Sequence, residues 1–321
     1  FSTFSMLIGV GFRAAGDAKT PFYAMILTSV LGIAFNPVLI LGLGPFPELG
    51  ITGSALTMSI SNFLGAVAMV AWVYWRDLPL KFRREEWSFL WPDRANLGYI
   101  VTKGVPLGGM MMISSSATLV MLGLVNREGA TTTAAYGAMI QVWNYIQMPA
   151  FAVSITVSAM AAQNIGAGRH DRVAGTVSAG LIMSATLTCA LFAVLVTFAE
   201  PILSLFLGTG SGAIPIAEHI QMVTSWSYIL NGLMMVMVGV LRAYGVVVIS
   251  MVISALSLYG ARLAFYFLLY PSLGTKALWL SFDFGAAIAL VLTWLVYSRG
   301  SWRPEHGLPR AASFKVRAKA G

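Results

Sequence analysis

The sequence predicts an all-α integral membrane protein, and three observations support this fold class. First, 58% of the 321 residues are hydrophobic and only 10% are charged, whereas about a quarter of the residues in a soluble domain are charged. Second, several apolar runs exceed the roughly 20 residues that a helix needs to cross a bilayer. Third, these runs are continuous and do not alternate, which favours membrane helices over the strands of a β-barrel.

The expected helices follow one another along the chain, and turns that contain glycine or proline separate them. The first apolar run is already under way at Phe1, so we expect it to be the end of a helix that starts upstream in a longer protein. Pro21 suits the first turn of the next helix, where its missing N–H costs no hydrogen bond. The expected helices are 1–14 (partial), 21–43, 51–75, 97–125, 131–160, 173–198, 214–242, 246–270 and 274–298.

The basic residues predict how the chain is oriented. If the connection after the first helix lies inside the cell and later connections alternate, 17 of the 20 Lys and Arg residues fall on the inside. This bias is the positive-inside pattern of a multi-pass plasma membrane protein, here a bacterial inner membrane protein with a cytoplasmic C-terminus. It accounts for the net charge of +8 without nucleic acid. We expect membrane lipids as neighbours and a monomeric protein.

A repeated turn indicates internal duplication. The segments 12–16 (FRAAG) and 241–245 (LRAYG) both end an apolar helix, and a new helix starts within a few residues of each. A Leu-Gly pair precedes a further helix downstream of both segments, at 49–50 and 273–274. Internal duplication is common in secondary transporters, whose substrate path lies at the interface between the repeats.

The residues of this turn suit the end of one helix and the start of the next. Gly16 and Gly245 are expected in the left-handed conformation that closes a helix. Arg13 and Arg242 place a cation at the negative helix end and near the headgroups. Asp17 is expected to accept hydrogen bonds from the N–H groups of the next helix. A purely structural turn and an added inside gate both remain open.

Six motifs occur in a fixed order along the chain. They are Arg13-x-x-Gly16-Asp17-x-x-x-Pro21, Asn36-Pro37, Leu49-Gly50-x-x-Gly53-Ser54-Ala55, Gly104-Val105-Pro106, Ala162-Gln163-Asn164-Ile165-Gly166-Ala167-Gly168 and Leu241-Arg242-x-x-Gly245. As an ordered set over about 1–298, they resemble the multidrug and toxic compound extrusion (MATE) family of cation-coupled antiporters. The resemblance implies a two-bundle (6+6 helix) transporter fold with a pseudo-twofold repeat, of which about eight full helices and one partial helix are present here.

This resemblance also implies a domain organisation. The segment 1–75 is expected to be the remainder of the N-terminal bundle, namely the end of helix 4 with helices 5 and 6. A cytoplasmic inter-bundle loop at 76–96 follows, then a C-terminal six-helix bundle at 97–298. We expect a basic cytoplasmic tail at 299–321, because this segment lacks apolar periodicity.

Coupling in the resembled family uses H⁺ or Na⁺ and carboxylates in the membrane, without a cofactor. The first-bundle carboxylate lies on the family's first helix, which is absent from this sequence. Asn36 matches a family asparagine and is the candidate for cation coupling, although a buried amide also serves as a contact between helices. Ser114 and Asn231 occupy places where some members carry acids, so we expect no second cation site.

Polar and adaptable side chains predict a substrate cavity. Asn144 and Gln147 lie three residues apart on one helix, with Tyr136 and Phe151 roughly along the same face. Methionine adapts to varied apolar ligands. The alternative for the amides is hydrogen bonding to neighbouring helices. The cavity candidates are Tyr136, Asn144, Gln147, Phe151, Ser114, Asn231 and Met234.

Arg262 and Asp283 are the two charges that lie deep within apolar runs. At about 1.5 Å per residue, each lies roughly 12–14 Å from the end of its helix. Neighbouring antiparallel helices would allow an intramembrane charge pair, which avoids the cost of an unpaired buried charge. A proton-carrying role for Asp283 and a wet cavity without pairing are the alternatives. The gate or turn candidates are Arg13, Gly16, Asp17, Pro21, Gln163, Gly166, Gly168, Arg242 and Gly245.

Together these features predict a secondary active antiporter that exports amphiphilic or cationic organic compounds (multidrug efflux) in exchange for H⁺ or Na⁺ by alternating access. No HExxH, GxSxG, CxxC or Walker A motif indicates an enzyme or a nucleotide-driven pump. His170 and His219 are expected near opposite faces of the membrane and His306 in the tail, so we expect no metal site. The alternatives are a lipid-linked oligosaccharide flippase of related architecture, or a non-transporting membrane protein.

Overall fold

The computed structural model describes the chain except for residues 1, 15, 44–46, 78–80, 82–93 and 301–321. Within the described residues every regular element is helical, and 8 helical runs are long and apolar enough to span a membrane. The predicted fold class, an all-α integral membrane protein, is confirmed. Most of the expected loop at 76–96 and nearly all of the tail at 299–321 lie outside the described residues.

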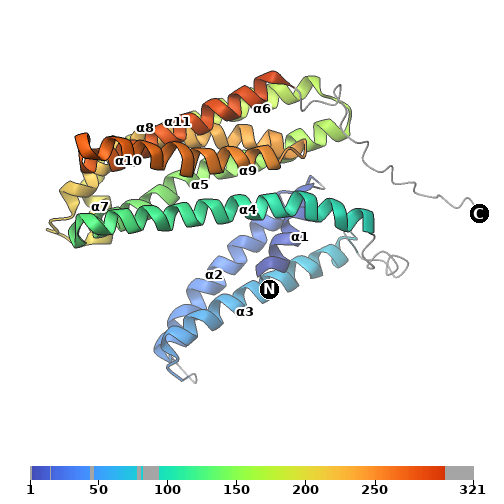
Figure 1. Cartoon of the computed structure of the whole chain (residues 1–321). Coiled ribbons are helices and arrows are strands. Elements are labelled where there is room, and N and C mark those ends of the chain that lie inside the picture. Colours follow the sequence, from blue (N-terminus) through green and yellow to red (C-terminus); the bar gives the residue numbers. More distant parts are fainter. Residues whose placement is uncertain (1, 15, 44–46, 78–80, 82–93, 301–321) are drawn as a thin grey trace, which may run out of the picture. The chain divides into compact units, whose positions relative to one another are not determined.

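The chain divides into two compact units, Phe1–Arg94 and Ala95–Gly321 (Figure 1). The first unit holds α1 (Ser2–Ala14), α2 (Lys19–Leu41) and α3 (Gly50–Trp75). The second unit holds α4 (Arg94–Val125), whose first residue belongs to the first unit, and the elements that follow it. These are η2 (Asn126–Glu128), α5 (Ala130–Gly166), α6 (Asp171–Thr197), α7 (Ala199–Leu207), α8 (Ile214–Ala243), α9 (Val248–Ala255), η3 (Leu256–Ala261), α10 (Arg262–Leu273) and α11 (Thr275–Arg299).

Three features differ from the sequence-based expectations. α5 continues to Gly166, six residues beyond the expected end at 160, because no helix-breaking residue intervenes. The nine-residue helix α7 was not expected, since it is too short to show a clear apolar period. The expected helix 246–270 contains a π-helical segment, η3, between α9 and α10. A π turn accommodates an extra residue within a helix, and hydrophobic periodicity does not reveal it.

Small residues allow α2 and α3 to pack closely in the first unit. A Cβ atom at Gly53 would collide with the carbonyl oxygen of Leu39, and one at Gly65 would collide with the side chain of Thr28. Close approach of helices at glycine is typical of membrane proteins, where packing replaces the hydrophobic effect. The face of α3 that carries Gly53 and Gly65 therefore faces α2.

α8 lies at the centre of the second unit and packs against α5, α6 and α11. One apolar cluster includes Tyr136, Tyr228 and Trp279. A second cluster includes Val157 and Val236 near the other end of α8. The second unit thus has two apolar clusters of its own, and α8 supplies side chains to both.

Candidate functional site

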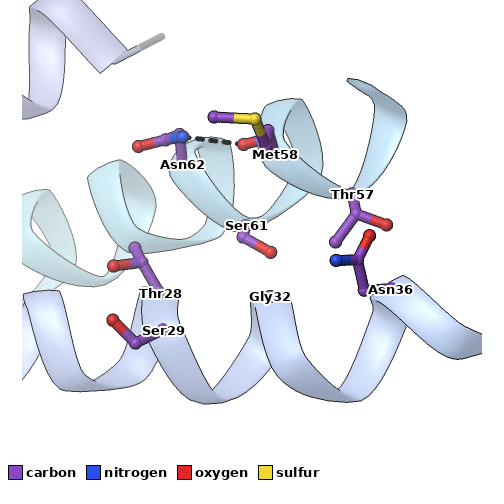
Figure 2. Close-up of a pocket in the computed structure, with 8 residues that line it drawn as sticks. All are labelled: Thr28, Ser29, Gly32, Asn36, Thr57, Met58, Ser61 and Asn62. Carbon is purple, nitrogen blue, oxygen red and sulfur yellow. Dashed lines mark hydrogen bonds between the residues drawn. The ribbon is translucent and has the colours of Figure 1, made fainter. Parts of the chain in front are cut away.

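A polar pocket of about 230 Å³ lies between α2 and α3 (Figure 2). Both helices are otherwise strongly apolar, so the hydroxyl and amide groups gathered here stand out from the rest of the two spans. Polar side chains within a membrane span are costly and mark functional sites by default. The lining residues are Thr28, Ser29, Gly32, Asn36, Thr57, Met58, Ser61 and Asn62.

The polar groups of the pocket come from both helices. In Figure 2 the amide of Asn36 on α2 points toward Thr57 on α3, and the Ser61 side chain is directed into the space between the helices. Thr57 is buried and donates its hydroxyl to the Gly53 carbonyl at 2.9 Å. Ser61 is only 3% exposed, and its hydroxyl has no hydrogen-bond partner in the described structure. Buried hydroxyls are normally paired, so this group points to a ligand or water.

The sequence explains why the pocket lies at this level of α2. Pro37 lies inside the helix, and proline has no N–H for the carbonyl four residues earlier. The carbonyl of Ile33 is therefore left without its helical donor, one turn from Asn36. On α3, Gly53, Thr57, Ser61 and Gly65 recur every four residues and share one face. Asn36 was predicted from the sequence and Ser61 was not, although this four-residue period of small and hydroxyl side chains marks the face that Ser61 shares.

The chemistry of the pocket suits a small cation or an ordered water. Its ligands are neutral side-chain oxygens and amides, which favour hard, weakly charged ions over transition metals. No carboxylate lines it. Among the described residues, no group of three or more His, Cys, Asp or Glu side chains is arranged to hold a metal ion. A tightly bound ion would therefore need a negative charge from outside this set of residues.

The expected cavity face on α5 separates into two stripes. Tyr136 and Gln147 are buried, and Gln147 donates to the Tyr228 carbonyl on α8 at 3.4 Å. Asn144 and Phe151 are exposed. At 3.6 residues per turn, the two stripes lie about 60° apart around the helix. All four side chains therefore lie within an arc of about 80°, which is roughly one face of α5, as predicted. Gln147 takes the alternative role of an amide contact between helices, and contact of this face with a substrate is not tested.

The other cavity candidates lie on α4 and α8. Ser114 is exposed on α4, whereas Asn231 and Met234 are half-buried on α8. Asn231 donates its amide to the Ser227 carbonyl at 3.2 Å within its own helix. Asn231 and Met234 are three residues apart and so share a face of α8. Their predicted contact with a substrate is untested by this geometry.

The structure does not form the expected ion pair between Arg262 and Asp283. The Asp283 carboxylate accepts the backbone N–H of Ser227 on α8 at 2.7 Å. The Arg262 guanidinium lies over the Phe282 ring, 3.3 Å from its centroid. Because Phe282 and Asp283 are consecutive on α11, their side chains diverge by about 100°, one toward α10 and the other toward α8. The prediction failed because equal depth in two helices does not make two side chains face each other.

The repeated turn has the expected geometry at both positions. Gly16 has a φ angle of 90°, and Gly245 has a φ angle of 76°. The N–H of Gly16 donates to Arg13 at 3.1 Å, and that of Gly245 donates to Arg242 at 2.9 Å. The residue after each glycine bonds the carbonyl five positions earlier, at 2.9 Å in both turns. These paired bonds define the Schellman motif, in which a left-handed residue satisfies the last helical carbonyls.

The other turn candidates also take part in helix ends. Gly168 has a φ angle of 71° and closes α5 with the same pair of bonds. Asp17 accepts the backbone N–H groups of Lys19 and Thr20 at 2.9 and 3.1 Å. The hydroxyl of Thr20 donates to the same carboxylate at 2.5 Å. This bond, with the backbone bonds beside it, holds the pKa of Asp17 below its usual range. The structural role proposed for the turn is observed, whereas a gating role is not tested.

Comparison with known proteins gives one family and several relatives. The family model MatE matches residues 106–268. A probable multidrug resistance protein of Bacillus subtilis, YoeA, is 36% identical over 287 residues, which cover 89% of this chain and 62% of YoeA. An FAD transporter of Shewanella oneidensis is 28% identical over 198 residues, covering 61% of this chain and 43% of that protein. The chain therefore spans less than two thirds of the length of either relative.

A solved structure shares the fold. The crystal structure of MATE in complex with MaL6 superposes with a TM-score of 0.83 at 18% sequence identity. The match covers 93% of this chain and 66% of that one. At this coverage the match includes residues of both units.

Proposed function

The chain belongs to the MatE family, and on this premise we propose that it works as a secondary active antiporter. It exports amphiphilic or cationic organic compounds in exchange for H⁺ or Na⁺ by alternating access. The relative named as a multidrug resistance protein supports this substrate class. The chain spans 62% of that relative's length. The proposed activity is therefore that of the whole protein of which this chain is part.

The α2–α3 pocket is the observation that supports ion coupling most strongly. Asn36, Thr57 and Ser61 bring an amide and two hydroxyls together within two apolar spans. The Ser61 hydroxyl has no partner although it is buried. Such groups are retained in hydrocarbon when they serve an ion or proton path. We assign the coupling site to this pocket, with a carboxylate from outside the described helices completing it.

Orientation and location follow from the charge pattern. The basic residues concentrate in alternate connections, which supports a multi-pass chain in the bacterial inner membrane with its C-terminus in the cytoplasm. The transported solutes and membrane lipids are then its partners. A monomer is sufficient, because alternating access requires movement between two units of one chain.

Replacement of Asn36 tests the coupling site. In proteoliposomes with an imposed Na⁺ or H⁺ gradient, Asn36→Leu is expected to lower the export of a cationic dye at least about tenfold. Ser59→Ala is the matched control, because Ser59 is exposed on α3 and its hydroxyl donates to the Ala55 carbonyl within the same helix. Equal export by both variants at equal protein yield would remove the pocket from the coupling mechanism.

A second candidate function is export of a phosphate-bearing solute. The relative named as an FAD transporter covers 61% of this chain. The buried cation Arg262 in the second unit favours a solute with an acidic group. Purified FAD offered to the same proteoliposomes would distinguish this candidate from export of cations alone.

A further inference from the structure

Arg262 is a buried cation with two donor nitrogens that have no hydrogen-bond partner among the described residues. Its side chain is 8% exposed, and neither Nε nor Nη2 has a hydrogen-bond partner within the described structure. One face of the guanidinium is covered by the Phe282 ring, at 3.3 Å from its centroid. A buried guanidinium normally bonds an acceptor with each of its N–H groups. The donors left over therefore require an explanation.

The two unused nitrogens lie on the same edge of the guanidinium. In arginine the N–H of Nε and one N–H of Nη2 point in parallel, away from the side-chain stem. A carboxylate or phosphate presents two oxygens at the matching separation, so this edge binds such groups through two parallel hydrogen bonds. Tyr136 is the polar group next to the guanidinium.

Among the described residues of the second unit, no carboxylate occupies this edge. Asp283 follows Phe282 directly in the chain, but its carboxylate accepts the Ser227 N–H at 2.7 Å. Glu128 accepts the Tyr270 hydroxyl at 2.7 Å at the far end of α10. Neither of them forms an ion pair with Arg262 in the part of the chain that the structure describes.

The depth of Arg262 in the membrane favours a solute over a lipid headgroup as the source of an acidic group that binds it. The residue lies 11 positions before Leu273, the last residue of the span Val248–Leu273. At 1.5 Å per residue this is roughly 16 Å, about the middle of a hydrocarbon core of some 30 Å. A phospholipid phosphate stays at the membrane surface. A solute that crosses the membrane passes this level.

The backbone before Arg262 has an unusual form. The π-helical segment Leu256–Ala261 ends at the residue that precedes it. The extra residue of a π segment turns the following helix relative to the preceding one, and such segments are frequent at functional sites. Gly285 on α11 allows the approach, because a Cβ there would lie 3.3 Å from the Arg262 Cβ. The π-helical segment and Gly285 thus place Arg262 against α11, and the regular α-helix is interrupted just before this residue.

From these contacts we propose that the Nε and Nη2 edge of Arg262 binds one carboxylate or phosphate group of a transported solute. The inference rests on the transport function proposed above and adds a substrate class to it. Solutes that carry an acidic group beside their apolar or cationic part are favoured. Arg262 is then a specificity-determining residue of the second unit, and the Tyr136 hydroxyl is its neighbour.

A pair of matched dyes tests the proposal in proteoliposomes. One dye is a rhodamine with a free carboxylate, and the other is its methyl ester. Arg262→Lys keeps the positive charge but lacks the parallel donors. It is expected to reduce transport of the carboxylate dye by about 10- to 100-fold relative to the ester. Ser272→Ala, an exposed position near the end of α10, is the control and leaves the ratio unchanged.

Several outcomes would overturn the proposal. An equal loss of both dyes in Arg262→Lys would show a structural role, and no loss would remove Arg262 from recognition. If Asp283→Asn changes the dye ratio in the same way, Asp283 is the acidic partner in another state. If the discrimination occurs only in vesicles with anionic lipids, the ligand is a lipid phosphate and not a solute.

A binding measurement separates this inference from the transport function. Thermal unfolding in detergent is followed with benzoate or inorganic phosphate, and with chloride at equal ionic strength. A saturable rise in Tm in the unmodified protein, absent in Arg262→Lys, supports the anion site even if neither dye is exported. Export of both dyes without any anion-dependent rise in Tm contradicts the inference and leaves the transport function standing.

Discussion

Substitution of Gly239 by alanine is predicted to force α5 and α8 apart. A Cβ at this position would lie 2.6 Å from the carbonyl oxygen of Ser154 and 2.8 Å from its hydroxyl. That hydroxyl donates to the Met235 carbonyl at 2.6 Å, so the same movement breaks a hydrogen bond between the helices. Both helices belong to the core of the second unit, and the nearest clash is with a backbone atom, so the helix itself has to move.

The expected cost follows from three contributions. Overpacking a tight contact costs about 1–3 kcal/mol, and an interhelical hydrogen bond in a membrane contributes about 0.6 kcal/mol. Alanine recovers about 0.5–1 kcal/mol through its helix propensity. The free energy of unfolding should therefore fall by about 1–3 kcal/mol.

Unfolding in detergent measures this change, with Gly175→Ala as the matched control. Gly175 lies in α6, and no atom lies within 4 Å of the Cβ that it would gain. Its replacement should raise stability slightly, by about 0.5–1 kcal/mol. If Gly239→Ala proves as stable as Gly175→Ala, the close packing of α5 on α8 described here is incorrect.

Three further substitutions give separate tests. Gly245→Ala places a Cβ at a φ angle of 76° and should cost about 1–2 kcal/mol of unfolding free energy, measured by thermal denaturation; an unchanged Tm would argue against the left-handed turn. Asp17→Ala should destabilise the protein by about 0.5–1 kcal/mol at neutral pH. Because hydrogen bonds lower the pKa of Asp17, its contribution is complete above about pH 4 and is lost as the pH falls through the folded-state pKa; a pH titration of stability that is identical in the variant would contradict this role. Tyr259→Phe removes the 2.6 Å hydrogen bond from the Tyr259 hydroxyl in η3 to the Ser116 hydroxyl on α4. The loss should cost about 0.6 kcal/mol of unfolding free energy, and faster amide hydrogen exchange in α4 is its specific readout.

The turns could be predicted residue by residue because their information is local. A glycine after an apolar helix, with a basic residue in the last turn, specifies its own conformation. The matching bonds at Gly16 and Gly245 confirm the prediction at both positions. The same reasoning located Asp17, whose side chain bonds the N–H groups two and three residues later.

The contacts between helices were less predictable because they depend on rotation about the helix axis. Arg262 and Asp283 were placed at equal depth, yet one meets Phe282 and the other meets Ser227. The π segment before Arg262 changes the rotation of α10, and no sequence period records it. Likewise, the sequence did not indicate which of the two amides on α5 is buried: Gln147 is buried and bonds α8, whereas Asn144 is exposed.

The α2–α3 pocket could be predicted from the sequence only in part. Asn36 was identified through its resemblance to a family motif, whereas the unpartnered hydroxyl of Ser61 became visible only with the two helices in place. The small residues at Gly53 and Gly65 specify which face of α3 meets α2. They could have indicated that Ser61, on the same face, points into the contact.

Coupled flux is the measurement that tests ion-driven export through this pocket most directly. A dye gradient is imposed across proteoliposomes that contain the intact gene product, and entry of Na⁺ or H⁺ is recorded in the opposite direction. We predict ion movement that depends on the dye, that is lost in Asn36→Leu and that persists in Ser59→Ala. Dye movement without any counterflow of Na⁺ or H⁺, or counterflow that Asn36→Leu leaves intact, would contradict it.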